Sequence, residues 1–296
     1  MAVLKLRSSS LAARYCWLLP LLPEFQHEHP NISLHIRSGN DLISRVLYSA
    51  MERLGTLRIA DLRGGQFDNV ICTRCDAVVA VPAGKAEDFA AFIREFDGIL
   101  KNEYAATDGG VTLTCAAADA DAAYSAEDSS RLLHVLLTLP QGVEVMSADF
   151  PGLVQTSLNL GVMTACGDGL HFSFSIRSSV ATQKELLLQR VRAIVEYTGG
   201  GTVSTRGDYP AWQYARQSPL RDTVMASYKQ ITGQDGVIMA THGGLECGLL
   251  INKMPGLDAV SLGPELHDIH SPRERLGVDS VKRMYALVCE VLKNCR

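Results

Sequence analysis

The chain has 296 residues, of which 47% are hydrophobic and 20% charged, and its formal net charge at pH 7 is -4. This composition is typical of a globular protein with a hydrophobic core, and the length suffices for one large domain or two ordinary ones. No run of lysines and arginines exceeds two neighbours. The sequence therefore lacks the basic footprint of a nucleic-acid-binding protein.

The cysteines and the N-terminus bear on the compartment. Eight cysteines stand at irregular spacings, whereas disulfide scaffolds are short and cysteine-dense, so we expect free thiols in a reducing cytosol. Residues 1–22 combine a basic start with an apolar run at 16–22. Prolines interrupt this run, no Ala-x-Ala site follows, and it is too short to span a bilayer. We predict a cytoplasmic protein without a membrane partner, and interpret residues 1–22 as a leader of unassigned role.

Residues 23–211 have the pattern of an α+β layer, in which strands carry helices on one face. The strand-like stretch 58–82 turns at Gly64-Gly65. A helix follows, because apolar side chains recur every three or four residues and predict one buried face. These side chains are Phe89, Phe92, Ile93, Phe96 and Leu100.

The next elements alternate between strands and helices. A glycine-rich turn at 167–169 indicates a hairpin between two strands, and Thr182 with Glu185 resembles a capping box. The predicted strands lie within 108–120, 153–166, 169–179 and 201–207, and the predicted helices within 125–140 and 183–198.

Residues 212–296 follow a different pattern, in which helices alternate with apolar strands, as in a parallel α/β sheet. Ser218-Pro219 indicates the start of a helix. Two strands cannot form such a sheet alone, so we expect another chain or a further segment to complete it. The predicted strands are 236–241 and 258–264, and a short helix begins within 243–250. The last helix, 280–294, has a predicted buried side of Val281, Met284, Tyr285, Leu287, Val288 and Val291.

The stretch "ELHDIHSPRE" at 265–274 is a candidate metal corner. His270 lies beyond the C-terminal end of a predicted strand, where parallel sheets hold ligands, and neutral imidazole suits zinc. The alternative is an ordinary exposed loop histidine. We interpret His267 and Asp268 as loop surface, because one metal rarely takes ligands this close in sequence.

The stretch "ATHGGLECG" at 240–248 is a candidate substrate site. Gly243 and Gly244 allow close approach of the backbone to a ligand, and the N-terminus of the following helix suits a carboxylate. Glu246 could bind an ammonium group or complement the helix dipole. Cys247 is a weak candidate nucleophile, since no base is paired to it in sequence.

Two further features have a functional and a structural interpretation. Cys72 and Cys75 form a single CxxC, but within a strand positions i and i+3 point to opposite faces, which favours two unrelated thiols. Arg177 stands alone near the end of an otherwise uncharged strand. Its planar fork suits a ligand carboxylate, and a structural salt bridge is equally compatible with the sequence.

Several stretches together resemble the cytosolic aminoacyl-histidine dipeptidases, in the dizinc peptidase clan that includes carnosinase. They are "VQTSLNLGVM", "IRSS", "YPAW", "THGGLECGLL" and "SLGPELHDIHSPRERL". The similarity runs from about residue 27 to 296. "LRGGQFDNVICTRCDAVVAV" resembles the family's lid segment, which keeps Asn69 and Arg74 here and has Cys72 where proline is usual.

The resemblance implies a catalytic α/β domain with a lid domain inserted in its middle, a homodimer formed through the lid, a dipeptide substrate and two zinc ions. His270 corresponds to a zinc ligand, and Arg177 to the residue that binds the dipeptide's C-terminal carboxylate. The substrate pocket corresponds to Asn69, Gly244 and Glu246.

The family's lid also carries Gly-Gly-His-Ser-Gly, whose histidine stabilises the tetrahedral intermediate. His29 stands in that place, although Glu28, Pro30 and Asn31 depart from the motif.

The sequence contains no His-x-Asp and no Glu-Glu, the family motifs that supply most metal ligands and the general base. We therefore expect the chain to comprise a lid (23–211) and the C-terminal part of a catalytic domain (212–296). Three interpretations stay open: a zinc dipeptidase, a non-catalytic remnant that dimerises or binds peptide carboxylates, and a truncated gene whose upstream part encodes the missing motifs.

Overall fold

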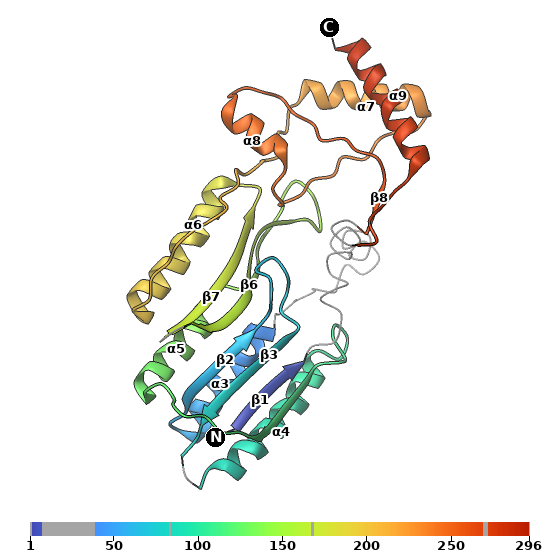
Figure 1. Cartoon of the computed structure of the whole chain (residues 1–296). Coiled ribbons are helices and arrows are strands. Elements are labelled where there is room, and N and C mark those ends of the chain that lie inside the picture. Colours follow the sequence, from blue (N-terminus) through green and yellow to red (C-terminus); the bar gives the residue numbers. More distant parts are fainter. Residues whose placement is uncertain (1, 8–38, 83, 167–168, 269–271, 296) are drawn as a thin grey trace. The chain divides into compact units, whose positions relative to one another are not determined.

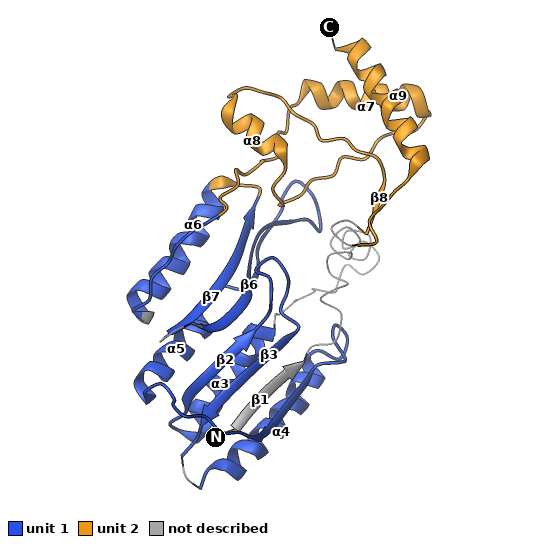
Figure 2. Cartoon of the chain, in the orientation of Figure 1, with its two compact units in different colours: residues 1–178, 182–206 blue, residues 179–181, 207–296 orange. Residues whose placement is uncertain are grey.

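The structure is a computed structural model that describes residues 2–7, 39–82, 84–166, 169–268 and 272–295. The chain divides into two compact units (Figure 2). Unit 1 contains residues 1–178 and 182–206, and unit 2 contains residues 179–181 and 207–296. Each unit is described separately below.

Unit 1 is built on one sheet in which every described pair of strands is antiparallel (Figure 1). Its order is β4-β1-β3-β2-β6-β5, and β7 also pairs with β6. The strands are β1 (Ala2–Arg7), β2 (Arg58–Gly64), β3 (Arg74–Ala80), β4 (Thr112–Ala117), β5 (Gly142–Met146), β6 (Val154–Cys166) and β7 (Gly169–Ser178).

Helices accompany this sheet, which confirms the mixed α/β fold expected from the sequence. Figure 1 shows α3 behind β2 and β3. The helices are α3 (Gly39–Leu54), α4 (Ala86–Glu103), α5 (Ala126–Thr138) and α6 (Ala181–Arg192), and the last continues as the π-helix η1 (Ala193–Gly199).

Several elements of unit 1 differ from the sequence-based description. Residues 2–7, interpreted above as part of a leader of unassigned role, form β1 between β3 and β4. Helix α3 and strand β5 were not anticipated. The strand predicted at 201–207 is wrong, because these residues have no regular secondary structure.

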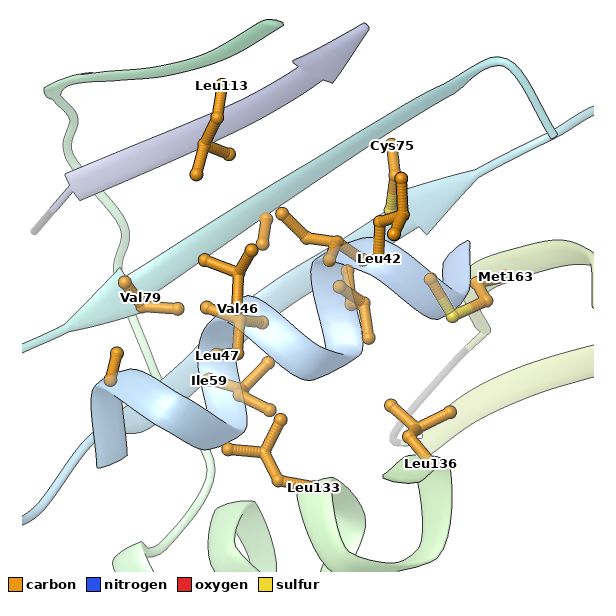
Figure 3. Close-up of a cluster of buried hydrophobic side chains, with 14 of the residues drawn as sticks. Leu42, Val46, Leu47, Ile59, Cys75, Val79, Leu113, Leu133, Leu136 and Met163 are labelled. Atoms are coloured by element: carbon orange, nitrogen blue, oxygen red, sulfur yellow. The ribbon is translucent and has the colours of Figure 1, made fainter. Parts of the chain in front are cut away.

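The core of unit 1 lies between the sheet and its helices (Figure 3). The predicted buried face of α4 is confirmed, since all five of its apolar side chains are buried. Helix α3 adds a second apolar face and contacts strands on both sides of the β2–β6 junction. Its buried hydrophobic side chains are Leu42, Ile43, Val46, Leu47 and Ala50.

The described ladder between β2 and β6 is the shortest in the sheet. Gly64 opposite Met163 is the one described pair in this ladder. The fully buried Asn40, at the start of α3, reinforces the junction by donating from Nδ2 to the carbonyl oxygen of Leu160 over 2.9 Å. A Cβ on Gly64 would lie 1.9 Å from Asn40 Oδ1, so this packing requires glycine.

Unit 2 contains three described helices and one short antiparallel pair. They are α7 (Pro219–Thr232), α8 (Glu246–Lys253), α9 (Val278–Asn294), β8 (Leu266–His267) and β9 (Arg275–Leu276). None of the described helices, in either unit, is both long and apolar enough to cross a membrane.

The predicted start of α7 is confirmed. Ser218 Oγ accepts a hydrogen bond from the Arg221 amide over 3.1 Å and donates one to Asp258 Oδ1 over 2.7 Å. Asp258 Oδ2 in turn accepts from the Leu220 amide over 2.9 Å. Two of the otherwise unpaired amides of the first helical turn are thereby satisfied.

The strands predicted at 236–241 and 258–264 are wrong for this structure, because both segments lack regular secondary structure. A strand needs a neighbour to accept and donate its backbone hydrogen bonds, and the described part of unit 2 offers none to either segment. Val237 and Met239 are accordingly 84% and 75% exposed.

The predicted buried side of the last helix is only partly correct. Leu287 and Val291 of α9 are buried against Val224 of α7, with Met284 packed beside them. The remaining predicted members of that side, Val281, Tyr285 and Val288, are exposed. The helix carries two apolar stripes, of which the described contacts bury one.

Two leucines of α5 test the assignment of the core. Leu133 is fully buried, whereas Leu137, one turn later, is 44% exposed. We expect Leu133→Ala to lower the free energy of unfolding by about 2–5 kcal/mol, and Leu137→Ala to change it by less than about 0.5 kcal/mol. Urea titration followed by circular dichroism measures both. Equal losses would contradict the assignment.

Candidate recognition face of unit 1

The turn between β2 and β3, which we call the 65–73 loop, displays a group of exposed side chains. It starts at Gly65, whose φ of +74° favours glycine. The Val70 amide donates to the Phe67 carbonyl oxygen over 3.3 Å and closes a turn. Phe67 is 62% exposed, and Asn69 and Val70 are exposed as well. The sequence-predicted Asn69 therefore stands at the tip of this loop.

The loop packs against β6 with almost no space between the two backbones. A Cβ on Gly161 would lie 2.5 Å from the Asp68 Cα and from the Phe67 carbonyl oxygen, and one on Gly65 would lie 1.7 Å from the Gly161 carbonyl oxygen. Such distances exclude any larger residue without movement of the loop. The ladder of β6 and β7 shifts register between Leu160 and Val162, which makes Gly161 a bulge residue.

Polar side chains tie the loop to the hairpin. Asn159 of β6 donates from Nδ2 to the carbonyl oxygens of Asp68 and Val70, each over 2.9 Å. Arg206 forms an ion pair of 3.1 Å with the Asp68 carboxylate and donates to Ser173 Oγ over 3.4 Å. Neither Asn159 nor Arg206 was singled out by the sequence analysis, because each acts on a loop far away in the chain.

Arg177 lies in β7 directly opposite Ser157 of β6. Its neighbour Ser178 is buried and hydrogen-bonds through its hydroxyl to Thr156 Oγ1 over 2.8 Å. Thr156 Oγ1 also donates to Gln183 Oε1 over 2.6 Å. This buried network fixes the end of β7, and because successive residues of a strand point to opposite faces, Arg177 projects from the other face.

Arg177 and the 65–73 loop occupy the same face of the β6–β7 hairpin. Residues 156, 158 and 160 of β6 are buried toward the core, so Ser157 and Asn159 point away from it. In this register Asn159 faces Ser175 and Ser157 faces Arg177, which makes Arg177 and Asn159 diagonal neighbours. We call this surface, with Ser157, Asn159, Ser173, Ser175 and Arg177, the outer face of the hairpin.

The Arg177 side chain is half-buried, and no ion pair or side-chain hydrogen bond joins its guanidinium to another residue of the described ranges. Its neighbours on the outer face, Ser157, Ser175 and Asn159, carry hydroxyl and amide groups, which cannot neutralise a guanidinium. A planar cation held in this way has the donors to bind an incoming carboxylate through two parallel hydrogen bonds.

In unit 2, the glycines of 243–248 pack against protein rather than leaving open space. A Cβ on Gly244 would lie 2.6 Å from the Tyr209 ring, and one on Gly248 would lie 2.9 Å from the Pro210 carbonyl oxygen. Glu246 is exposed in the first turn of α8. Burial, followed by the charges of Glu246 and Cys247, raises the pKa of Tyr209.

The candidate metal corner is described only in part. His267 is exposed in β8, and Asp268, at a φ of +55°, forms an ion pair of 2.8 Å with Arg275. His270 and His29 lie outside the described residues. Within the described ranges, no three His, Cys, Asp or Glu side chains gather closely enough to hold a metal ion.

The two thiols of the CxxC motif are buried structural groups. Cys75 belongs to the core, and Cys72 donates from Sγ to the Arg74 carbonyl oxygen over 3.0 Å. Burial raises the pKa of Cys72 to about 11 and that of Cys75 well above its ordinary value. Both are free cysteines. Because the thiolate is the reactive form, neither thiol is poised for chemistry.

Comparison with known proteins first identifies a domain family that matches part of the chain. Residues 26–108 match the peptidase dimerisation domain family of the M20 peptidases. This stretch contains α3, β2, β3 and α4 and therefore falls entirely within unit 1.

Two dipeptidases match most of the chain. A cytosol non-specific dipeptidase of Escherichia coli (strain K12) is 31% identical over 268 residues, which are 90% of this chain and 55% of that protein. The crystal structure of an aminoacylhistidine dipeptidase from Vibrio alginolyticus matches with a TM-score of 0.82 at 26% identity, over 99% of this chain and 57% of the other. The chain is homologous to these dipeptidases, which confirms the resemblance, and it spans little more than half the length of each.

Thiol reactivity tests the environment of the CxxC motif. With a pKa of about 11, roughly one Cys72 in a thousand is ionised at pH 8. We expect iodoacetamide at pH 8 to label exposed Cys295 quickly and Cys72 and Cys75 very slowly, while all three react in guanidinium chloride. Peptide mass spectrometry resolves the sites. Native labelling of Cys72 as fast as Cys295 would refute the buried assignment.

Proposed function

We propose that the chain acts in the metal-dependent hydrolysis of Xaa-His and other dipeptides, with unit 1 as the lid and dimerisation domain and unit 2 as part of the catalytic domain. The observation that supports this proposal most is Arg177, a guanidinium without a carboxylate partner in the described ranges, in a chain homologous to dipeptidases. A dipeptide always ends in a carboxylate, whatever its side chains.

In this proposal Arg177 fixes the C-terminal end of the substrate, and the outer face of the hairpin sets its direction. The hydroxyl groups of Ser157 and Ser175 flank Arg177 on that face and can donate to the same carboxylate or to bound water. Asn69 can donate to or accept from the peptide group, because its side chain carries both kinds of atom. Together they recognise the ends and backbone of a dipeptide rather than one side chain.

The remaining sequence-predicted residues keep the roles implied by the resemblance. Glu246 and Gly244 would line the substrate pocket, and His29 would stabilise the tetrahedral intermediate. We propose two zinc ions per complete site, with His270 as one ligand. Zinc would supply an activated water. Within the described ranges, no His, Cys, Asp or Glu side chains gather into such a metal site.

Two further properties belong to the proposal. The match of residues 26–108 to a dimerisation domain supports a homodimer formed through unit 1. The relative from Escherichia coli is a cytosol dipeptidase, and the free cysteines suit a reducing compartment. We therefore propose a cytoplasmic homodimer.

Binding of a dipeptide and of its C-terminal amide tests the role of Arg177. Hydrogen bonds to charged groups contribute about 1.5–3 kcal/mol, so Arg177→Ala should weaken binding of β-alanyl-histidine about 10- to 100-fold. Isothermal titration calorimetry on the full chain measures this. The amidated dipeptide should bind the wild-type chain about 10- to 100-fold more weakly than the acid does. Arg177→Ala should weaken binding of the amide only a little further.

Arg192 provides a matched control. It is also half-buried, lies on the neighbouring helix α6 and has no ion-pair partner within the described ranges. Arg192→Ala should leave dipeptide affinity unchanged. Arg177 would not be the carboxylate-binding residue if Arg177→Ala weakened binding of the acid and of the amide equally. The same conclusion would follow if Arg192→Ala weakened binding of the acid as much as Arg177→Ala does.

The dimerisation-domain match also favours a second candidate function, a non-catalytic module that dimerises and binds peptide carboxylates. Light scattering and a β-alanyl-histidine hydrolysis assay with added zinc separate the two. A dimer with turnover that His270→Ala abolishes supports the peptidase. A dimer that binds the dipeptide without turnover supports the module. A monomer would contradict the proposed assembly in both cases.

A further inference from the structure

We infer that Asn159 is a positioning residue that holds Asn69 in place for the substrate. The inference rests on the proposed function, in which Asn69 contacts the dipeptide. It concerns a residue 90 positions later in the chain, on another element, with no expected contact to substrate.

The hydrogen bonds of Asn159 bracket Asn69. Its Nδ2 donates to the carbonyl oxygen of Asp68 and to that of Val70, both over 2.9 Å. A side-chain amide nitrogen has two N–H groups, so both are used on the residues that flank Asn69. One side chain thereby fixes the peptide groups on either side of Asn69 and leaves the Asn69 side chain exposed.

The bulge at Gly161 brings Asn159 within reach. Because Gly161 has no side chain, the backbone at Phe67 and Asp68 can lie against β6, where a Cβ would stand only 2.5 Å away. Asn159 is two residues earlier and on the outer face of the hairpin. The amide therefore extends to the loop carbonyls while the strand keeps its pairing with β7.

The other restraints on the loop tip are weaker. The turn itself is closed by one backbone hydrogen bond of 3.3 Å. The ion pair of Asp68 with Arg206 is solvent-exposed on the arginine side, and exposed ion pairs contribute little. Among the described contacts of the loop tip, the two bonds from Asn159 fix the position of Asn69 most directly.

The substitution Asn159→Ala tests the inference in the full chain, with two measurements. Hydrogen–deuterium exchange should become faster in the peptide covering 66–71, while the peptides covering α4 stay unchanged. Calorimetry with β-alanyl-histidine should show binding weakened roughly five- to tenfold, the weight of about one hydrogen bond. Asn159→Asp, which keeps the size but places a carboxylate against two carbonyls, should do the same.

A double variant separates positioning from general damage. If Asn159 acts through Asn69, then Asn69→Ala/Asn159→Ala should bind no more weakly than Asn69→Ala alone. Arg206→Ala serves as the control for loss of a loop contact and should have a smaller effect on exchange and binding.

The outcomes distinguish this inference from the proposed function. Unchanged exchange at 66–71 in both Asn159 variants, or additive losses of binding in the double variant, would overturn the positioning role. If exchange at 66–71 is faster in the Asn159 variants but Asn69→Ala binds the dipeptide with wild-type affinity, then Asn69 does not contact the dipeptide. That result would remove the functional part of the inference and leave Arg177 to be judged by its own test.

Discussion

The close approach of two backbones at Gly161 is the constraint on which the rest of unit 1 depends. Four strands of the sheet lie on one side of the β2–β6 junction and three on the other, and one described ladder pair joins them. Backbone hydrogen bonds alone give this junction little strength. Gly64 leaves room for the Asn40 side chain, and Gly65 and Gly161 allow the 65–73 loop and β6 to approach each other closely. The side-chain amides of Asn40 and Asn159 add hydrogen bonds to those of the ladder.

This junction connects stability to recognition. On the buried side of the junction, Asn40 at the start of α3 donates a hydrogen bond to Leu160. On the outer side, Asn159 donates to the loop and is a diagonal neighbour of Arg177. The loop that carries Asn69 is consequently attached to β6 by two side-chain hydrogen bonds. Such an arrangement orients polar groups before a ligand arrives and lowers the cost of ordering them on binding.

The sequence predicted the local structure well where one period dominates. The apolar spacing of α4, the Ser218 cap and the hairpin of β6 and β7 each depend on neighbours in sequence, and each was found. Helix α3 carried the same kind of signal, since residues 42, 43, 46, 47 and 50 lie on one face, and this spacing would have sufficed to predict it. Ser157 and Asn159 alternate with Leu158 and Leu160; this pattern predicted the strand, but the polar face that it forms was not anticipated.

Features that depend on distant partners could not be predicted. Asn159 contacts a carbonyl 91 residues earlier, and no spacing rule encodes that pairing. The strands expected at 236–241 and 258–264 have the right composition, yet strand formation requires a neighbouring strand, which the described part of unit 2 does not provide. The second apolar stripe of α9 was assigned to the buried side for the same reason, because amphipathic spacing reveals which residues are apolar and not what covers them.

The measurement that tests the central claim most directly is the NMR signal of the Arg177 guanidinium. The Nε–Hε resonance, assigned by its loss in Arg177→Lys, should shift when β-alanyl-histidine is added to the full chain and remain in place when the C-terminal amide is added. A resonance that stays unchanged in both titrations, while signals of other arginines move, would contradict the account of a carboxylate-binding face on this hairpin.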